Sequence, residues 1–202
     1  METRILLVRH GQVDANLTKV WHGSTDSDLT PHGIDQAERL AEYFGRAPAT
    51  ARALYTSPLR RARDTAAPLG RVLGLVPMPL PGLTEFDIGA LEGLPFIELT
   101  QRHRFFERTA ADLAWAPPGG ESLGAVGARV LAAWRHVATM HAGQEAIAVS
   151  HSAAIAAGLA LLLHNDVREW RRYHVRNSSV TTIVLDPTPM LQSFDRVDHL
   201  PL

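Results

Sequence analysis

A short apolar segment near the amino terminus constrains this chain more than any other feature. Residues 5–8 read Ile-Leu-Leu-Val, an uninterrupted apolar run that is typical of a strand buried on both faces of a parallel sheet. The run ends abruptly at Arg9-His10-Gly11. Because ligands of open α/β sheets gather outside the carboxyl ends of the strands, the sequence predicts a nucleophile or an anion site where this strand ends.

A second apolar segment ends in the same way. Residues 146–149 read Ala-Ile-Ala-Val and are followed by Ser150-His151-Ser152. The carboxyl ends of parallel strands open onto one edge of a sheet, so His10 and His151 are expected to face a common site. Either histidine alone is more often a hydrogen-bonded structural group than a catalyst, but their equivalent positions favour a catalytic interpretation.

Strands alternate with helices along the rest of the chain. Helices are expected at about 31–45, from Leu59 until Pro68 kinks or ends the helix, from 123 to beyond 137, and from 152 to about 163; strands are expected at about 53–56, 76–80, 180–185 and 191–197. This alternation predicts a three-layer α/β/α sandwich with a mostly parallel central sheet. No composition break divides residues 1–202, and residues 94–117 are expected to form an irregular insertion beside the site.

Composition excludes several classes of protein. The chain has 202 residues and a formal net charge of -1, so no global field would attract nucleic acid or an anionic membrane. Cysteine is absent, which excludes disulfides and thiolate chemistry. There is no apolar run of about 20 residues and no signal-peptide pattern, so a cytoplasmic enzyme or binding domain is expected. These patterns do not indicate an oligomeric state.

Two further charged residues could complete an anion site. Arg61 is expected in the first turn of the helix that follows Ser57-Pro58, where free N–H groups and the helix dipole favour an anion. Arg9 and Arg61 could then hold phosphate oxygens in bidentate fashion. The alternative for Arg61 is a solvated basic helix face. Glu85 could serve as a general acid and base, or it could belong to a surface turn.

Six sequence blocks, in order, resemble the signature of the histidine phosphatase superfamily, the phosphoglycerate mutase-like proteins. The blocks are Leu7-Val8-Arg9-His10-Gly11-Gln12 with Asn16, His22-Gly23 with Thr25-Asp26, Ser57-Pro58-Leu59-Arg60-Arg61-Ala62, Glu85-Phe86-Asp87-Ile88-Gly89 with Glu92-Gly93, Gly119-Gly120-Glu121-Ser122, and Val149-Ser150-His151. Asn177-Ser178-Ser179-Val180 is a weaker seventh block. The resemblance implies the phosphoglycerate mutase-like α/β/α fold for the chain.

The resemblance also implies a role for each matched position. His10 would be the nucleophile that becomes phosphohistidine, and Arg9, Arg61 and His151 would surround the phosphate. Glu85 would protonate the leaving oxygen and then activate water. The residues implied to line the phosphate pocket are Gln12, Asn16, His22, Gly23 and, through its backbone, Ser152.

Such a site would need no metal and no cofactor, because arginine and histidine could supply the positive charge that phosphoryl transfer requires. The ten histidines include no His-Glu-x-x-His pattern, which disfavours a zinc site. The neighbouring arginines should also favour the neutral, nucleophilic form of His10.

The short 94–117 insertion resembles the phosphatase branch of the family, so the expected activity is hydrolysis of a small-molecule phosphate monoester. Phosphoglycerate mutase-type transfer and a catalytically silent phosphate-ligand binding protein are the alternatives. The family often has Trp where Leu91 stands, Gly where Ser152 stands and a smaller or amide side chain where His22 stands. These departures bear on substrate preference and remove no catalytic group.

The side chains of the insertion have two interpretations. Its aromatic residues either anchor the insertion to the core or contact the leaving group of the substrate, in which case its arginines would receive an acidic leaving group. The residues concerned are Phe96, Phe105, Phe106, Trp115, Arg102, Arg104 and Arg108.

Overall fold

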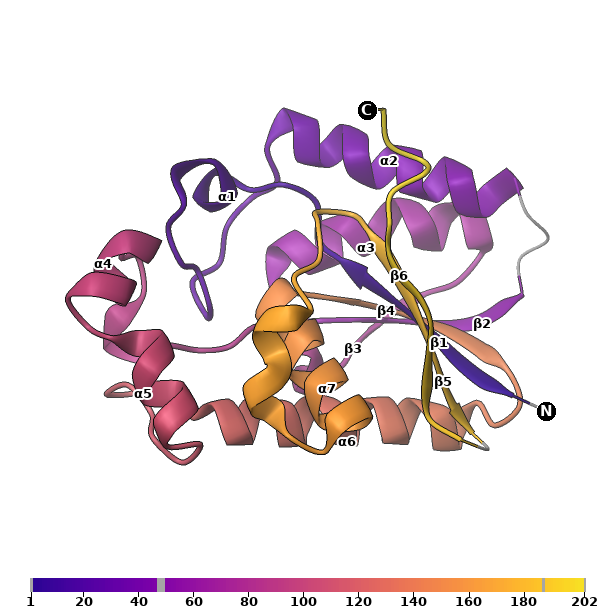
Figure 1. The fold of residues 1–202 in the computed structure, drawn as a ribbon. Coiled ribbons are helices and arrows are strands. Elements are labelled where there is room, and N and C mark those ends of the chain that lie inside the picture. The colour runs from indigo at the N-terminus through magenta and orange to yellow at the C-terminus, as the bar shows by residue number, and fades with distance from the viewer. Residues whose placement is uncertain (1, 47–49, 187, 202) are drawn as a thin grey trace.

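The computed structural model describes residues 2–46, 50–186 and 188–201. Their centre is a six-stranded sheet of order β3-β2-β4-β1-β5-β6 (Figure 1). The strands are β1 (Thr3–Arg9), β2 (Ala51–Thr56), β3 (Pro77–Pro79), β4 (Glu145–Ser150), β5 (Val180–Asp186) and β6 (Met190–Arg196). Strands β1 to β4 pair in parallel, whereas β5 and β6 join as an antiparallel edge. The predicted mostly parallel sheet is confirmed.

Helices cover both faces of this sheet (Figure 1). Helices α2 (Pro31–Arg46) and α3 (Arg60–Leu73) lie on one face, and α6 (Leu123–Met140) and α7 (Ser152–His164) lie on the other. Side chains of β1 alternate between the two layers: Ile5 and Leu7 pack in the α6–α7 core, and Val8 packs in the α2–α3 core. Alternation along one strand thus buries both faces and confirms the three-layer sandwich.

Of the two alternatives predicted at Pro68, a kink or an end of helix α3, the end is wrong. The helix continues through Pro68 and ends at Leu73, where Gly74 caps it in the left-handed conformation with φ 67°. Proline inside a helix costs about 3 kcal/mol. Pro68 is itself buried, as are Leu69 and Gly70 beyond it, so packing of this turn offsets the lost hydrogen bond.

The 94–117 segment is more regular than expected. It contains α4 (Phe96–Gln101) and α5 (Phe105–Ala111), and another short helix, α1 (Asp14–Thr18), follows β1. Helices of fewer than two full turns repeat their apolar positions too few times to give a clear period. Figure 1 shows all three on the side of the sheet toward which β1 and β4 run, so they border the predicted site.

Three 3₁₀ helices complete the described elements: η1 (Pro81–Leu83), η2 (Gly89–Leu91) and η3 (Val167–Arg172). Within the described ranges, no helix combines the length and apolar character that crossing a membrane requires.

Candidate active site

Strands β1 and β4 end side by side and bring two histidines together. Arg9 lies opposite Ser150 in the parallel register, and the backbone N–H of His10 donates to the Ser150 carbonyl at 3.0 Å. The imidazole rings of His10 and His151 have centroids 5.0 Å apart. Both rings are buried. The two strand ends therefore meet at this edge of the sheet and bring the two rings side by side.

The hydrogen bond of His10 determines which ring nitrogen is available for chemistry. Nδ1 of His10 lies 2.7 Å from the carbonyl oxygen of Gly11; since a carbonyl only accepts, Nδ1 carries the proton and Nε2 keeps its lone pair. Burial lowers the pKa of His10 well below its ordinary value of 6.5, and the charges of Arg61 and Arg9 lower it further. The ring is therefore neutral, with Nε2 as a free nucleophile.

His151 is held as the opposite tautomer. The Nε–H of Arg61 donates to His151 Nδ1 at 3.1 Å, so the proton lies on Nε2, which donates to Ser57 Oγ at 2.7 Å. Burial lowers the pKa of His151 well below 6.5, with the charge of Arg61 as the next cause. The sequence indicated Ser57 only as the start of a helix, but its hydroxyl fixes the orientation of a buried histidine.

Arg61 is buried, with 1 % of its surface exposed, so the solvated basic face is the wrong alternative. Besides its bond to His151, its Nη atoms donate to the backbone carbonyls of Thr25, His22 and Gly23 at 2.8, 3.1 and 2.8 Å. Four of the five guanidinium N–H groups are thus committed to the protein. A single donor remains for a ligand, and the bidentate grip expected from the sequence is not formed by Arg61 alone.

Arg9 has more donors available. Its Nη1 donates to the Val175 carbonyl at 2.6 Å, while its buried Nε has no partner among the residues described. Burial lowers the pKa of Arg9 to about 10, against the opposing effect of Glu85, so the guanidinium stays charged at neutral pH. An anion bound beside it would supply the missing acceptor.

Glu85 is fixed by three backbone N–H groups. Its Oε1 accepts from Phe86 at 2.8 Å and from Ala154 at 2.8 Å, and its Oε2 accepts from Ala153 at 3.1 Å. Ala153 and Ala154 belong to the first turn of α7, where the helix dipole favours a carboxylate. The side chain is 9 % exposed, which makes the surface-turn alternative wrong.

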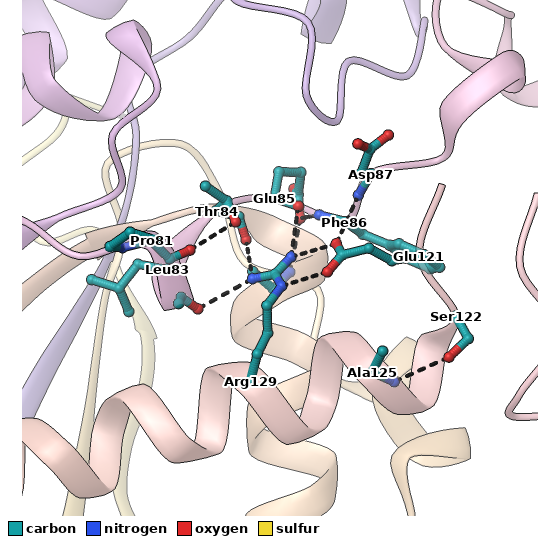
Figure 2. A network of polar contacts seen from close by, with 12 residues as sticks. Pro81, Leu83, Thr84, Glu85, Phe86, Asp87, Glu121, Ser122, Ala125 and Arg129 are labelled. Atoms are coloured by element: carbon teal, nitrogen blue, oxygen red, sulfur yellow. Dashed lines mark hydrogen bonds and ion pairs between the residues drawn. The ribbon is translucent and has the colours of Figure 1, made fainter. Parts of the chain in front are cut away.

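Arg129 of α6 clamps the segment that carries Glu85 (Figure 2). Its Nη groups donate to the carbonyls of Gly82, Thr84 and Glu85 at 3.1, 2.8 and 2.9 Å. The same guanidinium holds both carboxylate oxygens of Glu121 at 2.7 Å. Arg129 therefore ties a helix, the Glu121 loop and the Glu85 backbone into one unit.

These groups border a cavity of about 960 Å³. Seven of the residues expected at the site line it: Arg9, His10, Asn16, His22, Arg61, Glu85 and Ser152. His151 is fully buried beside His10 and does not line the cavity, and neither do Gln12 and Gly23. Instead, the Gln12 side chain accepts a hydrogen bond from Thr30 Oγ1 at 3.0 Å.

A family model for the histidine phosphatase superfamily (branch 1) matches residues 5–191. The chain belongs to this superfamily. Two similar solved structures are the Entamoeba histolytica phosphoserine phosphatase with 3-phosphoglyceric acid (27 % identity, TM-score 0.88, covering 98 % of this chain and 100 % of that one) and the mycobacterial glucosyl-3-phosphoglycerate phosphatase with VO3 (29 % identity, TM-score 0.83, covering 96 % and 99 %).

Two curated relatives differ in length. A bifunctional protein of Mycobacterium tuberculosis is 34 % identical over 180 residues, which are 89 % of this chain and 49 % of that protein. This chain thus spans about half the length of that relative. A probable phosphoglycerate mutase of Yersinia pestis is 30 % identical over 192 residues, covering 94 % of this chain and 88 % of that protein.

Gly23 helps to hold the loop that accepts hydrogen bonds from Arg61. Its backbone N–H, with those of Ser24 and Thr25, donates to the carboxylate of Glu92. A Cβ atom at Gly23 would lie 2.2 Å from the Phe86 carbonyl oxygen, so only glycine fits. Glu92 thereby holds the loop whose carbonyls accept from Arg61, which makes Gly23 a support of the site and not part of its wall.

Asn177 lines the cavity and was missed as a site residue. Its Nδ2 donates to the His10 carbonyl and to Asn16 Oδ1, both at 3.0 Å. Asn16 Oδ1 also accepts from the Val13 N–H at 3.1 Å. The weak seventh block, which begins at Asn177, was the only signal in the sequence.

The insertion supplies aromatic side chains but no arginine to the cavity. Phe96 and Phe106 line it, whereas Phe105 is fully buried in the core and Trp115 packs against that core. The arginines of the insertion lie elsewhere, where Arg102 pairs with Glu98, Arg104 pairs with Glu107 and Arg108 lies over Trp115. The hypothesis that these three arginines receive an acidic leaving group is therefore wrong.

Within the described part of the chain, no group of three or more His, Cys, Asp or Glu side chains is arranged to bind a metal ion.

Proposed function

We propose that this protein is a phosphatase that hydrolyses a small-molecule phosphate monoester through a phosphohistidine on His10. The observation that carries the proposal is the His10 ring, whose Nδ1–H is bound to the Gly11 carbonyl and whose Nε2 lone pair is free, in a cavity that the buried residues Arg9 and Arg61 also line. The related structures carry the names of a phosphoserine phosphatase and a glucosyl-3-phosphoglycerate phosphatase, which supports this chemistry. Residues 1–202 act as one domain in this proposal.

In the first step, Nε2 of His10 attacks phosphorus while the bond from phosphorus to the ester oxygen breaks. Glu85 acts as the general acid that gives a proton to the leaving oxygen, and the alcohol departs. The imidazole gains positive charge as it is phosphorylated. The hydrogen bond from Nδ1–H to the Gly11 carbonyl stabilises that charge.

In the second step, water attacks the phosphorus of phosphohistidine and the P–N bond breaks. The Glu85 carboxylate takes a proton from this water, which regenerates the acid and the neutral imidazole. Arg9 and Arg61 stabilise the charge on the equatorial oxygens in both steps. The proposal requires no metal ion and no cofactor, and EDTA is expected to leave turnover unchanged.

His10→Ala tests the nucleophile. We expect the variant to lose covalent labelling by ³²P from a labelled ester, and its turnover to fall by about three orders of magnitude or more, as for other covalent catalysts. His136→Ala is the control, since His136 lies exposed on α6. Labelled phosphate that persists on the His10→Ala protein would contradict the assignment and would redirect it to His151.

Phosphoglycerate mutase-type transfer is the second candidate, because one relative is named a probable phosphoglycerate mutase. A mutase must retain its product and rephosphorylate it before water attacks. Interconversion of 2- and 3-phosphoglycerate, measured beside phosphate release, separates the two activities. If a broad panel of esters released no phosphate and showed no transfer, the catalytically silent binding protein would be the correct alternative.

A further inference from the structure

The charge of the cavity is strongly one-sided. Among the described residues, Arg9, Lys19, Arg61, Arg171 and Arg176 line it, and Glu85 is the single acidic residue of the lining. The chain as a whole has a formal charge of -1, so the positive lining is local. Arg9 and Arg61 face the expected phosphate position, and Arg176 is neutralised by Asp195 at 2.6 Å. Lys19 and Arg171 remain as cations without an assigned role.

Lys19 is the single lysine of the chain and is held in an unusual conformation. It caps α1 in the left-handed region, with φ 56°, a conformation that is uncommon for residues other than glycine. Its carbonyl accepts from the Phe96 N–H at 2.9 Å, which fixes the lysine beside the start of α4. The side chain is exposed and forms no ion pair within the described ranges.

Arg171 differs from the arginines around it. Arg168 pairs with Asp166, and Arg172 pairs with Glu169. Arg171 instead lies with its guanidinium carbon 5.0 Å from the centroid of the Phe106 ring. No acidic side chain of the described residues pairs with it. The cation–π contact orients the guanidinium and leaves its N–H donors available.

One aromatic wall connects these two cations. The rings of Phe96 and Phe106 are stacked at 4° with centroids 6.5 Å apart, and Phe106 stacks on Trp170 at 6.2 Å. The backbone carbonyl of Lys19 accepts a hydrogen bond from the Phe96 N–H, and the Arg171 guanidinium lies over the Phe106 ring. The cavity therefore presents an apolar surface with two free cations attached to it.

We propose that Lys19 and Arg171 form a second anion subsite, which binds an acidic group on the leaving alcohol while Phe96 and Phe106 pack against its apolar part. This inference rests on the proposed phosphatase function. The volume of about 960 Å³ is near the upper end of the range for small-molecule sites, so the cavity has room for a leaving group well beyond the phosphate.

A matched pair of esters tests the subsite. 4-Carboxyphenyl phosphate and 4-carbamoylphenyl phosphate have nearly the same size and differ in one negative charge. We expect the wild-type protein to have the higher kcat/KM for the carboxylate, and the double variant Lys19→Met/Arg171→Met to lower the ratio of the two values about tenfold. Arg102→Met is the control, because Arg102 lies outside the cavity; the ratio should not change.

Binding to the His10→Ala variant gives a second readout that does not need turnover. Calorimetry should show tighter binding of the carboxylate ester, and Lys19→Met/Arg171→Met in this background should abolish the difference. Equal kcat/KM for the two esters in the wild-type protein would overturn the subsite and leave hydrolysis standing. If the His10→Ala variant bound the carboxylate ester more tightly but the wild-type protein released no phosphate from either ester, the subsite would be supported and the proposed hydrolysis would be overturned.

Discussion

At the scale of single residues, His10 and His151 make stability depend on pH because both are buried without charge. Burial lowers the pKa of each ring well below 6.5. Below pH 6.5 the unfolded chain therefore binds protons that the folded protein does not bind. The free energy of unfolding is expected to fall on acidification by about 1.4 kcal/mol per pH unit for each histidine.

Urea denaturation at pH 7.5 and pH 5.5 measures this dependence. The double variant His10→Gln/His151→Gln should lose less stability between the two pH values than the wild-type protein. His136→Gln, on the exposed surface of α6, should keep the wild-type dependence. An equal loss in the wild-type protein and the double variant would show that the two rings are not held neutral.

Arg61 has a second residue-scale consequence, since it bonds to His151 and to three carbonyls of the 22–25 loop. A lysine has no planar fork and cannot reproduce these bonds. We expect Arg61→Lys to lower kcat/KM by about 100-fold or more, since broken buried bonds to a charged group are worth about 1.5–3 kcal/mol each. Hydrogen exchange of the 22–25 amides should also accelerate. Arg63→Lys, on the exposed side of α3, is the control; equal effects of the two variants would contradict this role.

At the scale of elements, β1 and β4 were predictable because their apolar runs stop abruptly at polar residues, Arg9 in one case and Ser150-His151 in the other. The same logic predicted that His10 and His151 meet. The hydrogen bonds that hold the site residues in position were not predictable in this way. Ser57 and Asn177 act through hydrogen bonds between segments far apart in the chain, and no local period encodes such a contact. The helices of the insertion are too short to show a period.

The Arg129 clamp between α6 and the Glu85 segment gives a prediction at the element scale (Figure 2). Arg129→Met should lower the free energy of unfolding by about 2–4 kcal/mol, because it leaves buried carbonyls and Glu121 without their donor. Without the bonds from Arg129, the segment that carries Glu85 would shift, and Glu85 would donate a proton to the leaving oxygen less efficiently. Turnover of alkyl phosphates should therefore fall much more than turnover of p-nitrophenyl phosphate, whose leaving group needs no proton.

Arg135→Met is the matched control for this clamp, since Arg135 lies exposed on the same helix. It should change neither stability nor the ratio of the two turnover numbers. A uniform loss of activity on both classes of ester in Arg129→Met would indicate a purely structural clamp without an effect on Glu85.

At the scale of the whole molecule, positive side chains outnumber acidic ones in the described lining of the cavity, while the chain carries a formal charge of -1. Salt should therefore weaken the attraction of anionic esters to the cavity, over a screening length of about 10 Å at 0.1 M. We expect kcat/KM to fall several-fold between 20 and 300 mM salt. The value of kcat should stay nearly constant, because it describes ester that is already bound and no longer has to be attracted from solution.

The fall in kcat/KM should be steeper for 4-carboxyphenyl phosphate than for its carbamoyl analogue, since the former carries one more negative charge to the same cavity. A kcat/KM that is independent of salt for both esters would mean that the cavity charges act on the bound ester and do not attract it from solution.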